Sequence, residues 1–306
     1  MEVKQLYKAA EIEDALSDPE TAHLVLDRDE VVGMNKVPGL TVEPQQIEDG
    51  VDVYINLDEG TVVEKPVHLC FGVTDREAIQ RIILDIEIED NAEIGILAHC
   101  VFPRALDVKH VMDADIRIGK NAKYTYLEKH IHSPEGGVNV VPSARVELGE
   151  NSRFESDFEL VKGRVGELDI DYETTCRKDS VMEMTAKVDG RGDDVVKISE
   201  TGNLVGEGAR GVLTTRVALR EKARAEVFNK LTADAPYARG HVDCKEIVQG
   251  EGSAKAVPIV EVNHPKAHVT HEAAIGSVDT KQLETLMSRG LSEDESVDLI
   301  IEGLLS

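Results

Sequence analysis

Two short segments of the sequence carry the side chains best suited to chemistry. The segment "HVTHEAAIG", residues 268–276, holds His271 and Glu272 side by side, and "HVDC" holds His241 and Cys244. A thiolate, imidazoles and a carboxylate that converge near an exposed strand end would bind iron or another borderline metal. Thiolates are the usual ligands of iron–sulfur clusters, and nitrogen or oxygen ligands attach such a cluster more weakly. Weak attachment would suit a site that must release its cargo.

Other histidines and cysteines occur as pairs rather than as a complete ligand set. The pairs are His68 with Cys70, His99 with Cys100, and His130 with His132. His268 is the first residue of the segment 268–276, and His264 lies just before it. Period-two alternation places both members of the first pair on one strand face, and likewise both members of the third. A pair of ligands alone is more often structural than metal-binding. The four cysteines include no CxxC pair, so we expect no disulfide framework, and Cys176 is expected to serve packing.

The familiar motifs of nucleotide-binding and hydrolytic enzymes are absent from the sequence. There is no G-x-x-x-x-G-K-[ST] loop, no Gly-x-Ser-x-Gly elbow and no His-Glu-x-x-His helix. The segment "GEGARG", residues 206–211, matches G-x-G-x-x-G, but it has no βαβ context and is interpreted as turns. We therefore expect a chain that is not an enzyme and that binds no nucleotide itself.

The composition limits the partners and the compartment. A formal charge of −25 would repel nucleic acid and anionic membranes. No apolar run is long enough for a membrane span, and the N-terminus lacks the apolar core and cleavage site of a secretory signal. We expect a cytoplasmic protein without nucleic acid or membrane partners.

A short phrase recurs along the middle of the chain, and it sets the expected architecture. Each copy has apolar residues at alternate positions, then a turn, a small residue and renewed alternation. The copies are "IEIEDNAEI" from Ile86, "IRIGKNAKY" from Ile116, "VELGENSRF" from Val146, "VALREKARAEV" from Val217 and "EIVQGEGSAKA" from Glu246. The small residues Ala92, Ala122 and Ser152 are thirty residues apart, and Ala223 and Ser253 repeat this interval. Such a fixed period indicates one structural unit stacked on the next.

The alternation indicates short strands over residues 50–278, with almost no helix. We expect a mainly β fold, a right-handed parallel β-helix flattened into two sheets. A left-handed hexapeptide β-helix is the alternative, because "IGKNAK" and "LGENSR" each match one hexapeptide, but that fold needs consecutive hexads. Residues one coil apart would stack at roughly 4.8 Å. His241 and His271 are thirty residues apart and Cys244 and Glu272 twenty-eight, so the coil with "HVDC" can lie directly beneath the coil with "HVTHEA".

The two ends of the chain differ from the repeat. Residues 1–49 combine a helical pattern that starts at Val3 with extended segments, and we expect a small α/β cap on the first coil. Residues 279–306 predict a C-terminal helical segment. Its first helix ends near a glycine suited to a left-handed cap, and its second starts at Ser292 with a capping box to Glu295.

Both C-terminal helices carry apolar stripes at helical spacing. The stripes could pack on their own domain or dock onto another protein. They exceed what capping the last coil requires, so we predict that they bind a partner protein. The predicted partner-binding residues are Leu283, Leu286, Met287, Ile300, Ile301 and Leu304.

The C-terminal segments make the sequence similar to a known family. The segment "ARGHVDCKEIVQGEGSAKAVPIVEVNHPKAHVTHEAAIGSVDTKQLETLMSRGLSEDESVDLIIEGLL" from Ala238 resembles the C-terminal half of the SufB/SufD family, the scaffold subunits of the Suf iron–sulfur cluster assembly system. "GTVVEKPVHL", residues 60–69, is also similar to the family's segment at the start of its β-helix. The resemblance implies C-terminal helices that bind the ABC-type ATPase subunit SufC, which hydrolyses ATP. It also implies cluster assembly at an interface between two scaffold subunits.

The resemblance extends to individual residues. Cys244, His271 and Glu272 match the proposed cluster ligands of the SufB type, a combination that SufD types usually lack. The short N-terminal region, without the cysteine-rich motif of long SufB proteins, suggests a compact version that works with SufC as a homodimer. A SufD-like second scaffold in place of one copy is the alternative. The implied cofactor is a nascent, transient iron–sulfur cluster, and sulfur and iron donors are implied partners.

Two other functions stay open at this level. One is a purely structural adaptor of the ATPase, in which Cys244 is inert. The other is a β-helix enzyme that acts on acidic polysaccharide, which the low aromatic content and the acidic surface argue against. The sequence leaves open the cluster type, the cysteine that accepts sulfur, the choice between homodimer and heterodimer, and any role of flavin.

Overall fold

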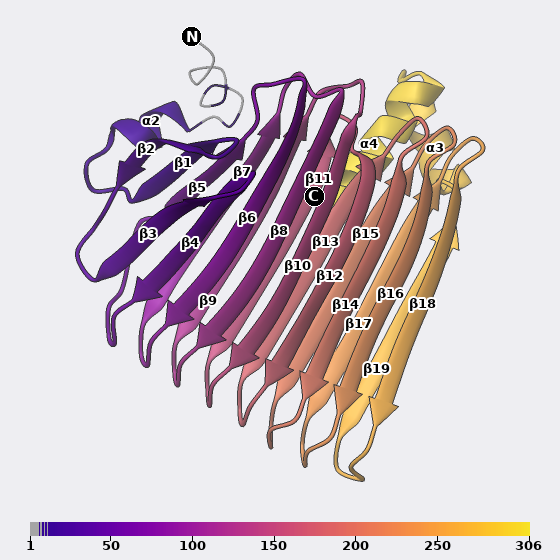
Figure 1. Ribbon diagram of the computed structural model, residues 1–306. Helices are drawn as coiled ribbons and strands as arrows, with labels where there is room; N and C mark the ends of the chain where they lie inside the picture. Colours follow the sequence, from indigo (N-terminus) through magenta and orange to yellow (C-terminus); the bar gives the residue numbers. More distant parts are fainter. Residues whose placement is uncertain (1–5, 7, 9, 11) are drawn as a thin grey trace.

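The computed structural model describes residues 6, 8, 10 and 12–306, and it is a parallel β-solenoid of about 8 turns in two sheets (Figure 1). Strands make up 60% and helices 9% of the chain, so the predicted mainly β fold, flattened into two sheets, is confirmed. Most coils contribute one strand of 10 to 12 residues to each sheet. This arrangement differs from the consecutive hexads that the hexapeptide alternative requires.

The two sheets stack coil upon coil, and neighbouring strands of one sheet come from successive coils. Sheet A contains, in spatial order, β19 (His268–Gly276), β17 (Arg239–Val248), β15 (Arg210–Leu219), β13 (Val181–Gly190), β11 (Arg153–Lys162), β9 (Lys123–His132), β7 (Glu93–Phe102), β5 (Val67–Gly72), β1 (His23–Asp27) and β2 (Glu30–Asn35). Sheet B contains β18 (Ser253–Val262), β16 (Arg224–Ala233), β14 (Val195–Leu204), β12 (Gly166–Cys176), β10 (Val138–Leu148), β8 (Asp107–Ile118), β6 (Glu77–Ile88), β4 (Gly50–Leu57) and β3 (Leu40–Ile47).

The first three copies of the recurring phrase form the turns that lead from sheet B to sheet A in successive coils. Asn91, Asn121 and Asn151 have φ angles of 59°, 57° and 58°, in the left-handed region that Asn tolerates better than most residues. The side-chain amide of Asn121 donates to Asn91 at 2.9 Å, and that of Asn151 donates to Asn121 at 2.8 Å. The small residue after each asparagine is buried. These three copies therefore form a ladder of equivalent turns, whereas the copies from Val217 and Glu246 form the turns on the opposite side, from sheet A to sheet B.

The coil length is not constant. Val138 lies thirty residues after its sheet partner Val108 but twenty-eight before its next partner, Gly166. Ala223 and Ser253, thirty residues apart in the sequence, are not equivalent positions of successive coils, because the strands there are offset by twenty-nine residues and Ser253 pairs with Arg224. Side chains alternate between the two faces of a strand, so a one-residue change in coil length moves a residue to the opposite face.

The N-terminal residues extend the solenoid. Strand β1 pairs in parallel with β5, and β3 pairs antiparallel with β4, so strands from the first 49 residues belong to both sheets. Helix α2 (Glu13–Ser17) precedes them. The predicted start of the N-terminal helix, Val3, lies outside the described residues.

The C-terminal segment forms two helices, as predicted. Helix α3 (Thr280–Met287) has Asp279 as its N-cap, and Gly290 after it has a φ of 99°. Helix α4 (Glu293–Leu305) starts with the predicted capping box between Ser292 and Glu295. Figure 1 shows both helices beside the last coils of the solenoid. Over the described part of the chain, no helix is long and apolar enough to cross a membrane.

Candidate functional site

The two segments with candidate ligands lie on adjacent strands. Strand β17 carries "HVDC", strand β19 carries "HVTHEAAIG", and the two pair in parallel as the last two strands of sheet A. His241 pairs with Thr270, and its Nδ1 lies 2.8 Å from the Thr270 hydroxyl oxygen. The prediction that these two coils are neighbours is therefore confirmed.

The predicted face-to-face stacking of the ligands is wrong in detail. The offset between β17 and β19 is twenty-nine residues, so Asp243 pairs with Glu272 and Cys244 pairs with Ala273. Alternation then turns Cys244 and His271 to the inner face of sheet A, and His241 and Glu272 to its outer face. The coil is one residue shorter than thirty, so the structure does not bring Cys244 and Glu272 onto one face.

Cys244 points into the interior of the solenoid. Its side chain is buried, and its Sγ lies 3.5 Å from Nδ2 of Asn229, a residue of the opposite sheet. The same amide nitrogen donates to the Thr215 hydroxyl at 2.7 Å. Burial raises the pKa of Cys244 to about 12, and the nearby Glu246 and Glu200 carboxyls add to this rise. The free protein therefore holds this residue as a thiol.

Two buried carboxyl groups near Cys244 were missed by the sequence reasoning. Glu246 is two residues beyond Cys244 on the same strand face, and Glu200 lies on β14 of the opposite sheet. Burial raises the pKa of Glu246 to about 7 and that of Glu200 to about 8. Both oxygens of Glu246 and Oε2 of Glu200 lack a hydrogen-bond partner among the described residues. Alternation from Cys244 to Glu246 is the signal that could have identified the first of them.

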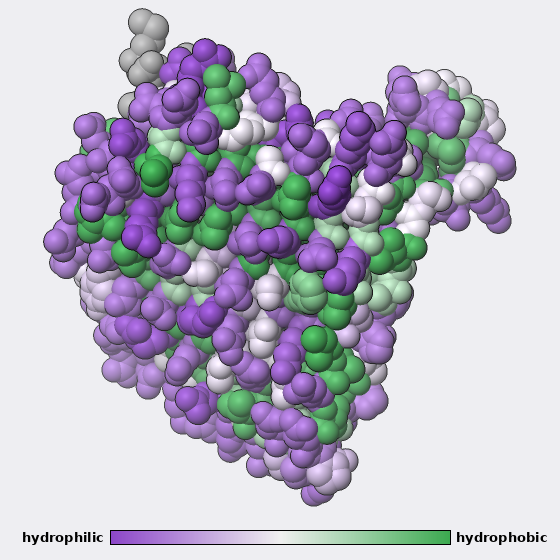
Figure 2. All heavy atoms as spheres, turned by 45° about the vertical axis from the view of Figure 1, so that its right-hand side comes forward, coloured by the Kyte–Doolittle hydropathy of each residue, from purple (hydrophilic) through white to green (hydrophobic). Residues whose placement is uncertain are grey.

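The ligand-bearing coil is also the open end of the solenoid. Strands β18 and β19 are the last strands of their sheets, and each pairs with a strand on one side. Ile259, Val262 and Ile275 on these strands are 39%, 47% and 48% exposed. Figure 2 brings this end forward and shows apolar side chains running along it. His271 and Glu272 are exposed on the same edge.

The C-terminal helices present part of the predicted apolar stripe. Ile301 is 1% exposed and packs with Ala218 and Leu305 on the outer face of sheet A. The prediction that Ile301 faces a partner is therefore wrong, because this residue attaches α4 to the solenoid. The other predicted stripe residues are half-buried or exposed, namely Leu283, Leu286, Met287, Ile300 and Leu304. Leu299, which the sequence reasoning missed, is 46% exposed.

A second group of polar side chains lies inside the solenoid, far from the C-terminal end. The ligand atoms of Cys100, Glu128 and His130 all lie within 4.8 Å of one another, a property that no other trio in the described part of the chain shares. Cys100 pairs in register with His130 between β7 and β9. Cys100 therefore lies beside His130 and not beside His99, its neighbour in the sequence. The His99 ring lies on the other side of the sheet and stacks on the His68 ring, with 5.7 Å between the ring centroids.

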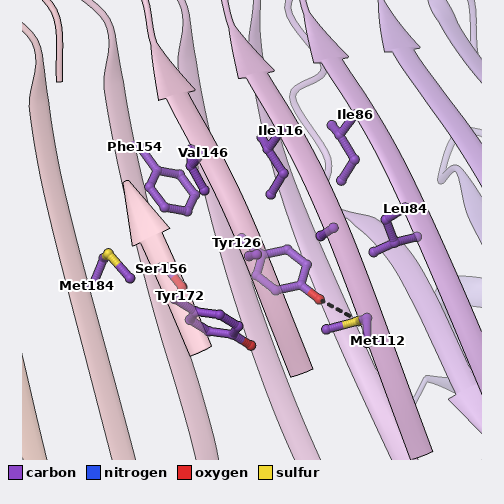
Figure 3. A pocket seen from close by; sticks show the side chains of 12 residues that line it. Leu84, Ile86, Met112, Ile116, Tyr126, Val146, Phe154, Ser156, Tyr172 and Met184 are labelled. Atoms are coloured by element: carbon purple, nitrogen blue, oxygen red, sulfur yellow. Dashed lines mark hydrogen bonds between the residues drawn. The ribbon is translucent and has the colours of Figure 1, made fainter. Parts of the chain in front are cut away.

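Burial governs the protonation of this interior group. It lowers the pKa of His130 and of His110 to about 3, and it raises the pKa of Glu128 to about 7. The Tyr172 hydroxyl donates to Glu128 at 3.4 Å. Tyr126 and Tyr172 also line a cavity of about 20 Å³, shown in Figure 3, which has room for about one water molecule. Alternation in "EKHIH" places Glu128, His130 and His132 on one face, which is the signal that sequence reasoning overlooked.

Comparison with known proteins identifies the family of the chain. Residues 73–304 match the model of the SUF system FeS cluster assembly, SufBD core domain. The chain is 38% identical over 282 residues to an iron-sulfur cluster assembly SufBD family protein of Methanocaldococcus jannaschii. The aligned region covers 92% of this chain and 89% of that protein. It is 35% identical to a SufBD family protein of Pyrococcus horikoshii, over 98% of this chain and 92% of the relative.

A more distant relative matches along the whole length. The SufBD family protein of Archaeoglobus fulgidus is 27% identical over 100% of this chain and 79% of its own length. The family match covers most of the solenoid and both C-terminal helices. The chain belongs to the SufBD family of iron–sulfur cluster assembly proteins.

Proposed function

We propose that this chain is a scaffold subunit on which an iron–sulfur cluster is assembled at the C-terminal end of the solenoid. The observation that supports this most is the position of Cys244 and His271. They share the inner face of the last two strands of sheet A, one strand from the open end. A thiolate and an imidazole are both ligands of iron–sulfur clusters.

Opening of the last strand would expose the buried thiol. Strand β19 covers Cys244 but has no strand on its far side, and most of its residues are exposed. Edge segments with few buried contacts open at lower free energy than the core of a protein. Iron then replaces the thiol proton, because metal binding requires the thiolate. Glu272 lies on the outer face of β19 and would join the coordination when β19 moves, while His241 lies on the outer face of β17 beside it.

A second copy of the chain is the proposed partner at this edge. The unpaired strand edges of β18 and β19 and their exposed apolar side chains favour pairing with another chain. A two-fold pair is the commonest closed assembly, and it would place two ligand sets next to one interface. A SufD-like second scaffold could take the same position. Sulfur and iron donors would supply the site.

The C-terminal helices are the proposed contact for the SufC-type ATPase. Helix α3 has no buried residue, and a groove between α3 and α4 is lined by Leu286, Leu299 and Ile300 together with polar residues. Deletion of residues 279–306 should abolish co-purification with the ATPase and leave the β-sheet circular dichroism largely unchanged. A truncated chain that still binds the ATPase would place the contact elsewhere. Met287→Ser and Leu299→Ser are surface variants that should weaken binding without unfolding the helices.

Anaerobic reconstitution with iron and sulfide tests the proposed scaffold role. The absorption spectrum should show cluster bands, and protein-bound iron and sulfide should be present after desalting. The second candidate function, a structural adaptor of the ATPase, is favoured by one observation, the burial that keeps Cys244 a thiol. A protein that stays colourless and binds the ATPase would support the adaptor.

A further inference from the structure

The interior group around Cys100 contains more hydrogen-bond acceptors than hydrogens. The amide nitrogen of Gln80 donates to two backbone carbonyls, those of Arg28 at 2.8 Å and Gly72 at 3.0 Å. This orientation turns Oε1 of Gln80 toward Nδ1 of His110 at 2.9 Å, so Nδ1 must carry the hydrogen. The other ring nitrogen, Nε2, is left as a lone pair and lies 3.7 Å from Sγ of Cys100.

The hydrogen-bond partners also determine which nitrogens of His132 and His130 carry a hydrogen. Nδ1 of His132 lies 3.1 Å from the carbonyl oxygen of Arg164, which can only accept, so this nitrogen donates. Nε2 of His132 then accepts from Nδ1 of His130 at 3.2 Å. Nε2 of His130 is consequently a second lone pair, and it lies 2.8 Å from Oε1 of Glu128. The Cys100 thiol, the Glu128 carboxyl and the His130 lone pair therefore lie within 4.8 Å of one another, and the His110 lone pair faces Cys100 at 3.7 Å from outside this group.

We propose that Cys100, Glu128 and His130, with His110 as fourth ligand, form a buried binding site for one divalent cation of the ferrous iron or zinc class. The Sγ of Cys100 lies 3.9 Å from Oε1 of Glu128 and 3.7 Å from Nε2 of His110. Ligands of a tetrahedral zinc-type site are about 3.3–3.7 Å apart. The contact between Glu128 and His130 is shorter because a hydrogen bridges it, and a cation would replace that hydrogen.

The charges balance in the bound state. Binding of the cation releases two protons to solvent, one from the Cys100 thiol and one shared by Glu128 and His130. The resulting thiolate and carboxylate offset the two positive charges, and the two imidazoles stay neutral. A neutral assembly is what a buried site requires, because an uncompensated charge there is strongly destabilising. One thiolate, one carboxylate and two imidazoles suit a borderline cation and disfavour Mg²⁺.

The surroundings resemble those of a built metal site. Gln80 and the His132–Arg164 pair hold the far nitrogens of both imidazoles, as outer groups do for histidine ligands of metals. Phe102 packs on His110 at 5.1 Å between ring centroids, and Phe158 packs on His130 at 4.8 Å. These rings exclude water from the ligands. The site is independent of the proposed cluster site, since β17 lies five strands from β7, roughly 24 Å at the usual strand spacing.

Cobalt(II) is the probe for this site, and Cys244→Ser is the background that removes the C-terminal thiol. The protein is loaded under anaerobic conditions, both in the folded state and by refolding in the presence of Co²⁺. We expect one Co²⁺ per chain and a thiolate-to-cobalt charge-transfer band after either treatment. Addition of Zn²⁺ or Fe²⁺ should bleach the band, and an excess of Mg²⁺ should leave it unchanged.

Variants identify the ligands. Cys100→Ser in this background should lose the band, and Glu128→Gln should weaken Co²⁺ binding by at least about tenfold. Cys70→Ser and Cys176→Ser remove buried thiols elsewhere and should keep the band. Circular dichroism confirms that each variant is folded. The proposal is overturned if the folded Cys244→Ser protein shows no charge-transfer band after direct loading and none after refolding with Co²⁺. It is also overturned if Cys100→Ser in this background retains the band.

Discussion

At the scale of single residues, one position of register decides what the candidate ligands can do. Cys244 and Glu272 could be identified from the sequence as ligand types, and the adjacency of their strands could be predicted from the repeat. Their faces could not, because a coil of twenty-nine residues turns Glu272 outward while Cys244 points inward. Alternation marks Glu200 as inward on its own strand, but its proximity to Cys244 has no sequence signal, because the two residues lie on opposite sheets.

Buried Glu200 should make stability depend on pH. Burial raises its pKa from 4.5 to about 8 in the folded protein. The folded state therefore holds a proton that the unfolded state releases, and this stabilising contribution is lost as pH rises from 4.5 through about 8. Glu200→Gln cannot ionise, so its melting temperature should fall less than that of the parent between about pH 5 and about pH 9. If the melting temperatures of the two proteins change equally with pH across this range, the raised pKa of Glu200 is contradicted.

At the scale of elements, the turn conformation repeats regularly, whereas the number of residues per coil varies. The phrase with an asparagine and a small residue predicted both the stacking and the turn positions, because Asn91, Asn121 and Asn151 all adopt left-handed backbone. The change of coil length further along the chain lies in turns whose residues differ from this phrase. The apolar stripe that contains Ile301 could also be predicted from the sequence. That Ile301 packs on Ala218 could not, because this contact depends on how the helix lies on the solenoid.

Asn121 is the test of the turn ladder. Replacement by Ala removes its hydrogen bonds to Asn91 and Asn151 and leaves a left-handed backbone that costs about 1 kcal/mol or more. Asn121→Gly loses the same hydrogen bonds but relieves the backbone. We expect melting temperatures in the order parent, Gly variant, Ala variant. An Ala variant as stable as the Gly variant would show that the left-handed conformation contributes nothing.

At the scale of the whole molecule, the solenoid has an open, apolar C-terminal edge. Repeat proteins need capped ends to stay soluble as single chains, and here β18 and β19 are instead exposed. The family assignment covers this end, since the matched region runs to residue 304. The edge that carries His271 and Glu272 is thus also the surface proposed for a second chain.

The proposed dimer can be broken at that edge. Ile275→Lys places a charge on an exposed apolar position of β19 and should shift light scattering from dimer toward monomer. Val195→Lys is the matched control, because Val195 is also an exposed apolar residue but lies on an inner strand, β14. A parent protein that is already a single chain in its complex with the ATPase would argue against the dimer.

The most direct test of the scaffold role is cluster retention by Cys244 variants. Parent, Cys244→Ser, Glu272→Ala and Cys176→Ser are reconstituted anaerobically with iron and sulfide, desalted, and compared by absorption and by protein-bound sulfide. Cys244→Ser and Glu272→Ala should each retain markedly less cluster, and Cys176→Ser should match the parent, with circular dichroism unchanged throughout. A Cys244→Ser protein that holds iron and sulfide as well as the parent would contradict cluster assembly at this end of the solenoid.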